Sequence, residues 1–118
     1  MEREGRNLVQ VGRDAEDRAA TYLVEQGYTI VTRRYKVNRG EIDLIALDGE
    51  TLVFVEVKHR RAPGYTPEES IGAAKIQAIQ RAIRQYVAEM EIGEREVRLD
   101  LIAIDGEGLR HHRDILAP

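Results

Sequence analysis

The chain has 118 residues, of which 42% are hydrophobic and 33% are charged, and its formal net charge is −3. This length suffices for one domain with a buried core and is too short for two, so we expect a single domain over residues 1–118. The absence of cysteine excludes a disulfide framework, a thiolate zinc site and a cysteine nucleophile. No apolar run approaches the roughly 18 residues of a membrane span, so we expect a cytoplasmic protein without membrane contact.

The first predicted elements are a helix over residues 5–26 and a strand after it. Small and apolar residues recur at helical spacing in this segment, and Gly27 stands where a helix-ending glycine is expected. From Tyr28 the residues become β-branched and aromatic, which predicts a strand that ends before a loop at 38–40.

Two apolar runs, at 42–47 and 52–57, predict a β-hairpin. Between them lie Asp48, Gly49 and Glu50, which are typical of a tight hairpin turn. The second run is apolar at both its odd and its even positions, so both faces of that strand are expected to be covered. It is therefore predicted to be a central strand of the sheet.

A second helix is predicted to begin at the N-cap residue Thr66 and to end at Gly93, although Gly72 could divide it into a short and a long piece. A strand at 96–104 follows, and residues 109–115 are assigned to a short final strand. The main elements have the order α-β-β-β-α-β. This order predicts an α/β fold with a mixed β-sheet flanked by helices.

Two acidic residues fall on faces that the predicted pairing makes apolar. A two-residue turn at Gly49 and Glu50 would place Asp43 directly opposite Glu56, and a turn starting at Asp48 would make them diagonal neighbours. A three-residue loop would send them to opposite faces. Two carboxylates held close together on a buried face destabilise the fold unless a cation lies between them, and oxygen-only ligands favour Mg²⁺ or Mn²⁺.

Lys58 lies two residues after Glu56 and therefore on the same face of the strand. The alternative to a catalytic role is a simple ion pair between these two residues at the end of the strand. If Asp43 and Glu56 hold a metal that activates water, Lys58 would orient the nucleophile or neutralise negative charge during phosphodiester hydrolysis.

Glu16 and Lys75 lie within the apolar stripes of the two predicted helices. Glu16 stands four residues before Ala20, so its carboxylate is expected to face inward, and the alternative is a glutamate that reaches solvent from the edge of the stripe. Lys75 lies between Ile71 and Ile79 in the same way, and the alternative is a lysine that exposes its amine at the core edge.

Basic side chains gather in short stretches although the net charge is negative. The candidates for nucleic-acid contact are Arg33, Arg34, Arg39, Arg60, Arg61 and Lys75. The alternative is that the basic runs are solvated loop ends. The histidines are poor candidates for the catalytic centre: His59 is expected on the face opposite Lys58, and His111 and His112 at a solvated edge.

Several of these residues also form a recognisable pattern. The pattern consists of Gly12 with Glu16, Gly27-Tyr28, Gly40-Glu41-Ile42-Asp43, Phe54-Val55-Glu56-Val57-Lys58 with Arg60, Lys75 and Arg98-Leu99-Asp100. Over nearly the whole chain it resembles the YraN-like family of uncharacterised bacterial proteins. That family is similar to the PD-(D/E)XK nucleases, and its structural relatives include archaeal Holliday junction resolvases.

The resemblance implies a restriction-endonuclease-like fold and dimerisation. It also implies Asp43 and Glu56 as metal ligands, the carbonyl of Val57 as a further ligand, Lys58 as the catalytic lysine and Glu16 as an accessory acid.

We therefore expect a Mg²⁺-dependent or Mn²⁺-dependent nuclease that acts on nucleic acid, with DNA ranked ahead of RNA and branched or damaged DNA as suggested substrates. The alternative is a non-catalytic nucleic-acid-binding or scaffold protein that retains the fold. Clustered acids favour the nuclease, because pure binding does not require carboxylates where phosphate approaches. An α/β domain with structural ion pairs ranks below both.

Overall fold

The computed structural model describes residues 8–60 and 64–117. These residues form a five-stranded sheet with the strand order β1-β2-β3-β4-β5. The elements are α1 (Leu8–Glu25), β1 (Thr29–Val37), β2 (Gly40–Asp48), β3 (Thr51–His59), the 3-10 helix η2 (Pro67–Ser70), α2 (Ala73–Glu89), β4 (Val97–Asp105) and β5 (Gly108–His112). The predicted α/β class and order are confirmed, and β5 is the short final strand.

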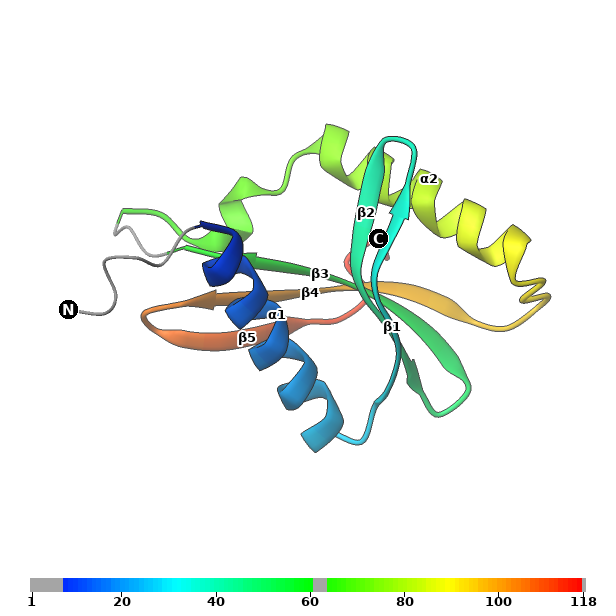
Figure 1. Ribbon diagram of the computed structural model, residues 1–118, viewed down its shortest axis with the longest axis horizontal. Coiled ribbons are helices and arrows are strands. Elements are labelled where there is room, and N and C mark those ends of the chain that lie inside the picture. The colour runs from blue at the N-terminus through cyan, green and yellow to red at the C-terminus, as the bar shows by residue number, and fades with distance from the viewer. Residues whose placement is uncertain (1–7, 61–63, 118) are drawn as a thin grey trace.

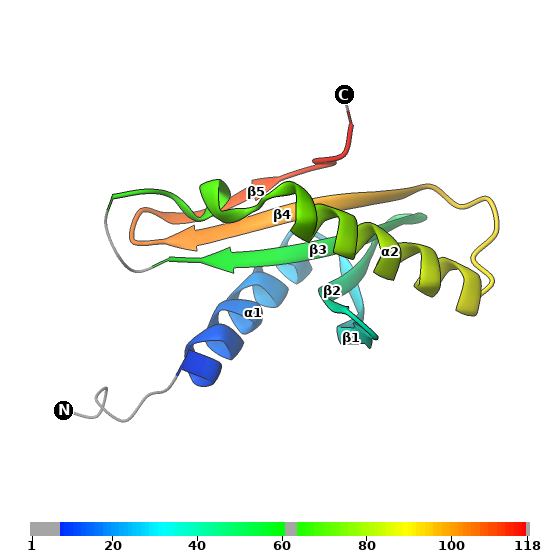
Figure 2. The same cartoon turned by 90° about the horizontal axis from the view of Figure 1, so that it is seen from above.

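The sheet is mixed. β3 and β4 are parallel, whereas the pairs β1–β2, β2–β3 and β4–β5 are antiparallel. Parallel strands need a crossover connection, and η2 and α2 supply it between β3 and β4. Figure 2 shows β3, β4 and β5 running side by side with α1 inclined to them. Among the described helices, none is both long enough and apolar enough to span a membrane.

The two helices cover opposite faces of β3, which is a central strand as predicted. Val53 and Val55 pack in the same cluster as Ala19 and Leu23 of α1. On the other face, Phe54 packs in a second cluster with α2, whose buried residues are Ile79, Ala82 and Tyr86. The alternation of side chains along β3 thus places each helix on its own side of the sheet.

The β2–β3 hairpin has the register that brings Asp43 and Glu56 together. Asp48 pairs with Thr51, so Gly49 and Glu50 form a two-residue turn. Gly49 has φ 63°, a left-handed conformation that glycine adopts without steric cost. This confirms the first of the predicted turn alternatives.

Pairing between β2 and β3 stops after Leu44 and Val55. Beyond this point β2 curves away, so that the β1–β2 hairpin stands steeply across the direction of β3, β4 and β5 (Figure 1). Ile42 consequently packs in the cluster on the α2 face, although strict alternation would place it with Leu44 on the α1 face. The divergence of the two strands is the feature that creates the candidate site.

The second helix begins later than its strongest sequence signal predicts. Thr66 makes no side-chain capping bond, and the turn after it is the 3-10 helix η2. The chain is extended at Ile71 and Gly72, and α2 starts at Ala73. The division at Gly72 into a short and a long piece is therefore confirmed.

Candidate active site

Asp43 lies where β2 and β3 separate. Its Oδ2 accepts a hydrogen bond of 2.7 Å from the backbone N–H of Val57. The β2–β3 pairing has already ended at this position, so the carboxylate accepts the N–H that a paired strand would otherwise accept through its backbone carbonyl. This bond fixes Asp43 beside Glu56, the preceding residue of β3.

Glu56 is a buried acid between two lysines, with a side chain that is only 4% exposed. Its Oε2 lies 3.7 Å from Nζ of Lys58 and 3.6 Å from Nζ of Lys75. Its Oε1 is buried and has no hydrogen-bond partner among the described residues. A buried polar atom without a partner costs free energy, so this oxygen is suited to a ligand that the protein itself does not supply.

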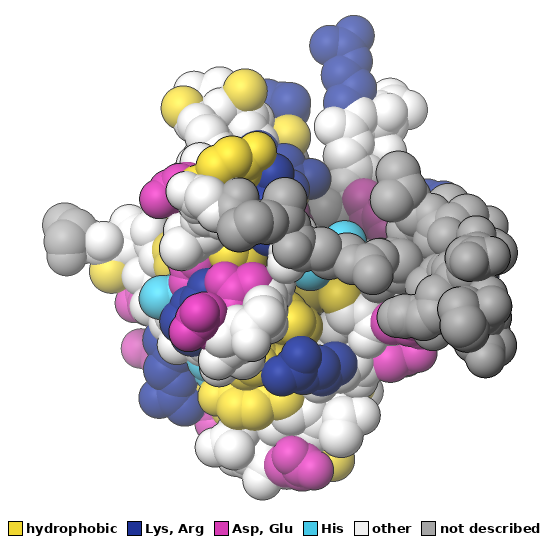
Figure 3. Space-filling view, turned by 90° about the vertical axis from the view of Figure 1, so that its left-hand side faces the viewer, with side chains coloured by type: hydrophobic (Ala, Val, Ile, Leu, Met, Phe, Trp, Pro, Cys, Tyr) yellow, Lys and Arg dark blue, Asp and Glu magenta, His cyan; other side chains and the backbone are white. Residues whose placement is uncertain are grey.

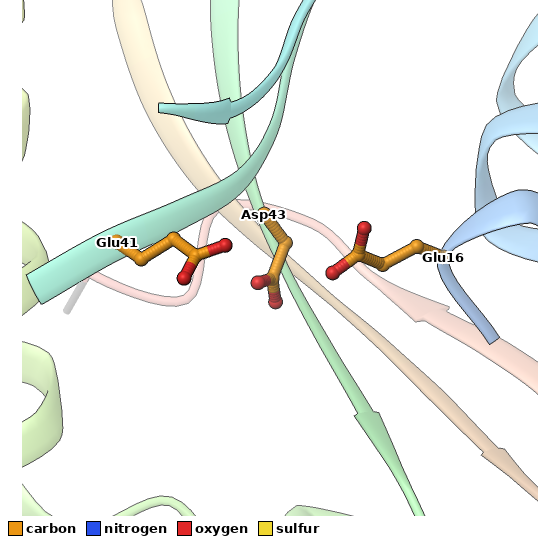
Figure 4. A group of neighbouring side chains, drawn as sticks. All are labelled: Glu16, Glu41 and Asp43. Atoms are coloured by element: carbon orange, nitrogen blue, oxygen red, sulfur yellow. The ribbon is translucent and has the colours of Figure 1, made fainter. Parts of the chain in front are cut away.

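Two further carboxylates, from α1 and β2, converge on Asp43. Oxygen atoms of Glu16 on α1, and of Glu41 and Asp43 on β2, all lie within 4.8 Å of one another. Figure 4 shows the three side chains pointing toward one another, with Asp43 between the other two. Asp43 therefore lies at the junction of this group with Glu56.

The electrostatics of the site favour an additional cation. Burial first, and then the negative charge of Glu56, raise the pKa of Asp43 to about 8, against the lowering effect of the Val57 N–H. Burial also raises the pKa of Glu56 above its ordinary value, although Lys75 and Lys58 act in the opposite direction. Crowded carboxylate oxygens, one of them on Glu56 without a hydrogen-bond partner in residues 8–60 and 64–117, fit a hard divalent ion such as Mg²⁺ or Mn²⁺.

The structure brings together most of the site predicted from the sequence. The residues gathered there are Glu16, Asp43, Glu56, Lys58 and Lys75. Val57 takes part through its N–H, and the role of its carbonyl as a metal ligand stays a prediction. Glu41 was not predicted, although its position two residues before Asp43 on one strand already placed both side chains on the same face.

Two of the predicted nucleic-acid contacts are engaged in ion pairs with α1. Arg33 lies 2.5 Å from Asp17, and Nε of Arg34 donates to Oε1 of Glu16 at 2.7 Å. Both arginines lie within β1 rather than at a loop end. Their contact with phosphate stays a prediction. It requires each arginine to bind phosphate in addition to its acidic partner or in place of it.

The other predicted basic contacts have different surroundings. Arg39 lines a pocket of about 340 Å³ that also includes Arg81 of α2. The guanidinium of Arg60 lies 4.2 Å from the ring centre of Tyr65 and donates to its hydroxyl. Arg61 lies outside the described residues. Figure 3 views the side toward which β3 and β4 run, where basic side chains stand among acidic and apolar ones rather than in one block.

A second pocket, of about 350 Å³, adjoins the carboxylate group. Its lining combines basic and acidic side chains with one glycine, and consists of Gly12, Arg13, Glu16, Arg34, Lys36 and Glu41. Basic side chains and two of the clustered carboxylates thus line the same open pocket. This arrangement suits an anion that contacts the basic side chains while it lies beside the carboxylates.

The expectation that both C-terminal histidines lie at a solvated edge was wrong for His111. Its side chain is 8% exposed, and Nε2 lies 2.8 Å from Oδ2 of the fully buried Asp100. Nδ1 lies 3.0 Å from the hydroxyl of Tyr22 on α1. His112 is 42% exposed and pairs with Glu68, while His59 lies beside Gly12 of α1, on the face opposite Lys58 as predicted.

Comparison with known sequences shows that the candidate site lies in the part of the chain that matches a protein-family model. The sequence model of the uncharacterised protein family UPF0102 matches residues 15–104. A UPF0102 protein of Carboxydothermus hydrogenoformans is 36% identical over 115 residues, which cover 93% of this chain and 98% of that protein. A UPF0102 protein of Chlorobium limicola is 42% identical over 105 residues, covering 87% of this chain and 81% of that protein. One of Desulforapulum autotrophicum is 43% identical over 96 residues, covering 80% and 79%.

Proposed function

The chain belongs to the uncharacterised protein family UPF0102, and from that premise and the geometry of its acids we propose that it is a metal-dependent nuclease acting on DNA. The observation that carries the proposal is the buried Oε1 of Glu56 next to Asp43, which has no hydrogen-bond partner in the described part of the chain, with Lys58 beside the same carboxylate. A structural ion pair at Oε2 alone would leave this buried Oε1 with neither a hydrogen bond nor a ligand.

Asp43 and Glu56 are the residues that would hold Mg²⁺ or Mn²⁺, with Glu16 and Glu41 as neighbouring carboxylates and the Val57 carbonyl as a further ligand. When bound, the ion would lower the pKa of a water molecule and stabilise charge on the phosphate. Lys58 contributes an ammonium on a side chain that is 29% exposed, so a substrate phosphate can reach it while it remains close to Glu56. It would orient the attacking water or neutralise charge that develops on the phosphate.

Lys75 has a different task in this proposal. Its Nζ lies 3.6 Å from the same Glu56 oxygen that faces Lys58. Two ammonium groups at Oε2 hold the Glu56 carboxylate in one orientation and leave Oε1 to the metal. The lysine on α2 thereby links the position of that helix to the geometry of the site on β3.

The proposal is tested with a panel of duplex, single-stranded and branched DNA, and matched RNA, incubated with Mg²⁺ or Mn²⁺. We expect cleavage of at least one DNA substrate by the wild type and none by Asp43→Asn. Lys58→Ala should cut roughly 100-fold more slowly or worse while still folding and binding metal. Arg84→Ala, which removes an exposed charge on α2, serves as the control and should retain activity.

Binding of DNA without cleavage of any substrate would support the alternative, a non-catalytic nucleic-acid-binding or scaffold protein. Cleavage that persists in Asp43→Asn would remove this site from the reaction.

A further inference from the structure

Arg34 occupies an unusual position on β1. It lies opposite Asp43, because the residue pairs on either side of it keep β1 and β2 in register. Its φ is 57°, in the left-handed region that residues other than glycine seldom adopt. A conformation of this kind persists only when the surroundings determine it, and the contact of the Arg34 side chain identifies one such constraint.

That contact is with one of the clustered carboxylates. Nε of Arg34 donates to Oε1 of Glu16 at 2.7 Å, and the Glu16 side chain is only 13% exposed. Glu16 also belongs to the group whose oxygens lie within 4.8 Å of one another with Asp43 and Glu41. A guanidinium and a divalent cation at Asp43 would therefore compete for the same Glu16 carboxylate.

The surroundings of Arg34 also offer it another partner. The pocket beside the carboxylates is lined by Arg34 together with Arg13 and Lys36, so an anion entering it meets three cationic side chains. Guanidinium groups bind phosphate and carboxylate with the same forked geometry. With 31% of its side chain exposed, Arg34 can be reached by such an anion.

We propose that Arg34 is a positioning residue that couples phosphate binding to metal binding. Without phosphate, Arg34 holds Glu16. When a phosphodiester enters the pocket, the guanidinium turns to the phosphate and the Glu16 carboxylate is released to the cation at Asp43. This inference rests on the proposed function, and because coupling between two sites is reciprocal, metal must raise the affinity for phosphate by the same factor.

The chain supplies a matched control one residue away. Arg33 also joins β1 to α1 by an ion pair, but its partner Asp17 is 63% exposed and is not part of the carboxylate group. Arg33→Gln removes the same charge and the same kind of bridge between these two elements. Any general effect of lost positive charge should therefore appear in both variants.

The test measures Mn²⁺ affinity by calorimetry in wild type, Arg34→Asn, Glu16→Gln and the double variant. Asparagine is chosen at position 34 because it tolerates the left-handed conformation. We expect Arg34→Asn to bind Mn²⁺ about 5- to 10-fold more tightly than wild type. In the Glu16→Gln background the same change should have no effect, and Arg33→Gln should alter the affinity about twofold at most.

A second set of measurements adds dimethyl phosphate, a phosphodiester that is not a strong metal chelator. It should tighten Mn²⁺ binding by the wild type toward the Arg34→Asn value and leave Arg34→Asn itself unchanged. Mn²⁺ binding that is lost in Asp43→Asn but shows no coupling between positions 34 and 16 would overturn this inference alone. If Arg33→Gln bound Mn²⁺ as much more tightly than wild type as Arg34→Asn does, this inference alone would likewise be overturned. Absence of Mn²⁺ binding, or binding unaffected by Asp43→Asn, would overturn the proposed function together with it.

Discussion

At the scale of single residues, Asp43 connects the parts of the site. It accepts a hydrogen bond from Val57 of β3 and faces Glu16 of α1, and burial and the negative charge of Glu56 raise its pKa. Each contact has a different dependence on charge. The bond from Val57 needs only an acceptor oxygen, whereas repulsion from the glutamates and attraction of a cation both need the ionised carboxylate.

Asp43→Asn separates these contributions, because the amide oxygen still accepts the Val57 N–H while the charge is lost. We expect the metal-free variant to melt at the same temperature as the metal-free wild type or slightly higher. Mg²⁺ at tenfold excess over its dissociation constant should stabilise the wild type by about 1.4 kcal/mol, or roughly 4 to 8 °C, and the variant hardly at all. Thermal unfolding monitored with Mg²⁺ and Mn²⁺ checks this, and equal shifts in both proteins would place the ion elsewhere.

At the scale of elements, Asp100 fastens β5 and the segment after it to β4. Its fully buried carboxylate accepts bonds from Arg98 and from the backbone N–H of Asp114, and lies 2.8 Å from His111. Burial opposes ionisation, but the bonds from His111, Arg98 and Asp114 lower the pKa of Asp100 below its ordinary value. Arg98 in turn reaches Asp48 at the end of the β2–β3 hairpin.

Asp100→Asn should lower the free energy of unfolding at neutral pH by about 2 kcal/mol, because charge-assisted bonds are lost. A carboxyl whose pKa is depressed by folding contributes stability above its unfolded pKa, near 4, and loses it as the pH falls through the folded value. The difference between wild type and variant in urea unfolding should therefore be smaller at pH 3 than at pH 7.

Glu94→Gln is the control, since it removes a carboxylate that lies exposed in the loop between α2 and β4. A difference for Asp100→Asn that stays constant between the two pH values would contradict this account of the carboxylate.

The sequence predicted what depends on short-range pattern. Alternation along β3 and the turn residues around Gly49 limited Asp43 and Glu56 to three relative placements, because both signals come from neighbouring residues, and the observed register selects the one in which the two lie opposite each other. The buried position of His111 was missed because its partners Tyr22 and Asp100 lie on α1 and β4, and no local pattern specifies which helix covers β5. The ion pairs of β1 with α1 escaped prediction for the same reason.

At the scale of the whole molecule, a protein of net charge −3 must bind nucleic acid through local groups of basic side chains rather than through its overall charge. Arg33 and Arg34 are already paired with acids of α1. Arg39 beside its pocket and Arg60 on Tyr65 have no carboxylate partner among the described residues. These two can therefore contact phosphate without giving up an acidic partner, whereas Arg34 must exchange its glutamate partner for it.

Removing both charges in the double variant Arg39→Gln and Arg60→Gln should flatten the salt dependence of DNA binding by roughly one to two units of slope. Fluorescence anisotropy of labelled duplex DNA without divalent metal measures this. The exposed pair Arg84→Gln and Arg95→Gln is the control and should leave the slope unchanged. Equal slopes for wild type and the Arg39→Gln, Arg60→Gln double variant would indicate that these two arginines are solvated surface residues that do not contact DNA.

The separation of β2 from β3 also has a mechanical consequence. The clustered acids belong to α1, β2 and β3, and α1 rests on the sheet partly through the small side chains of Ala15 and Ala19, which bury little area each. A cation held between Glu16 and Asp43 would act as a clip, since α1 could not lift from the hairpin without breaking a ligand bond. In a chain without cysteine, the proposed metal centre would thus supply the kind of cross-link that a disulfide supplies elsewhere.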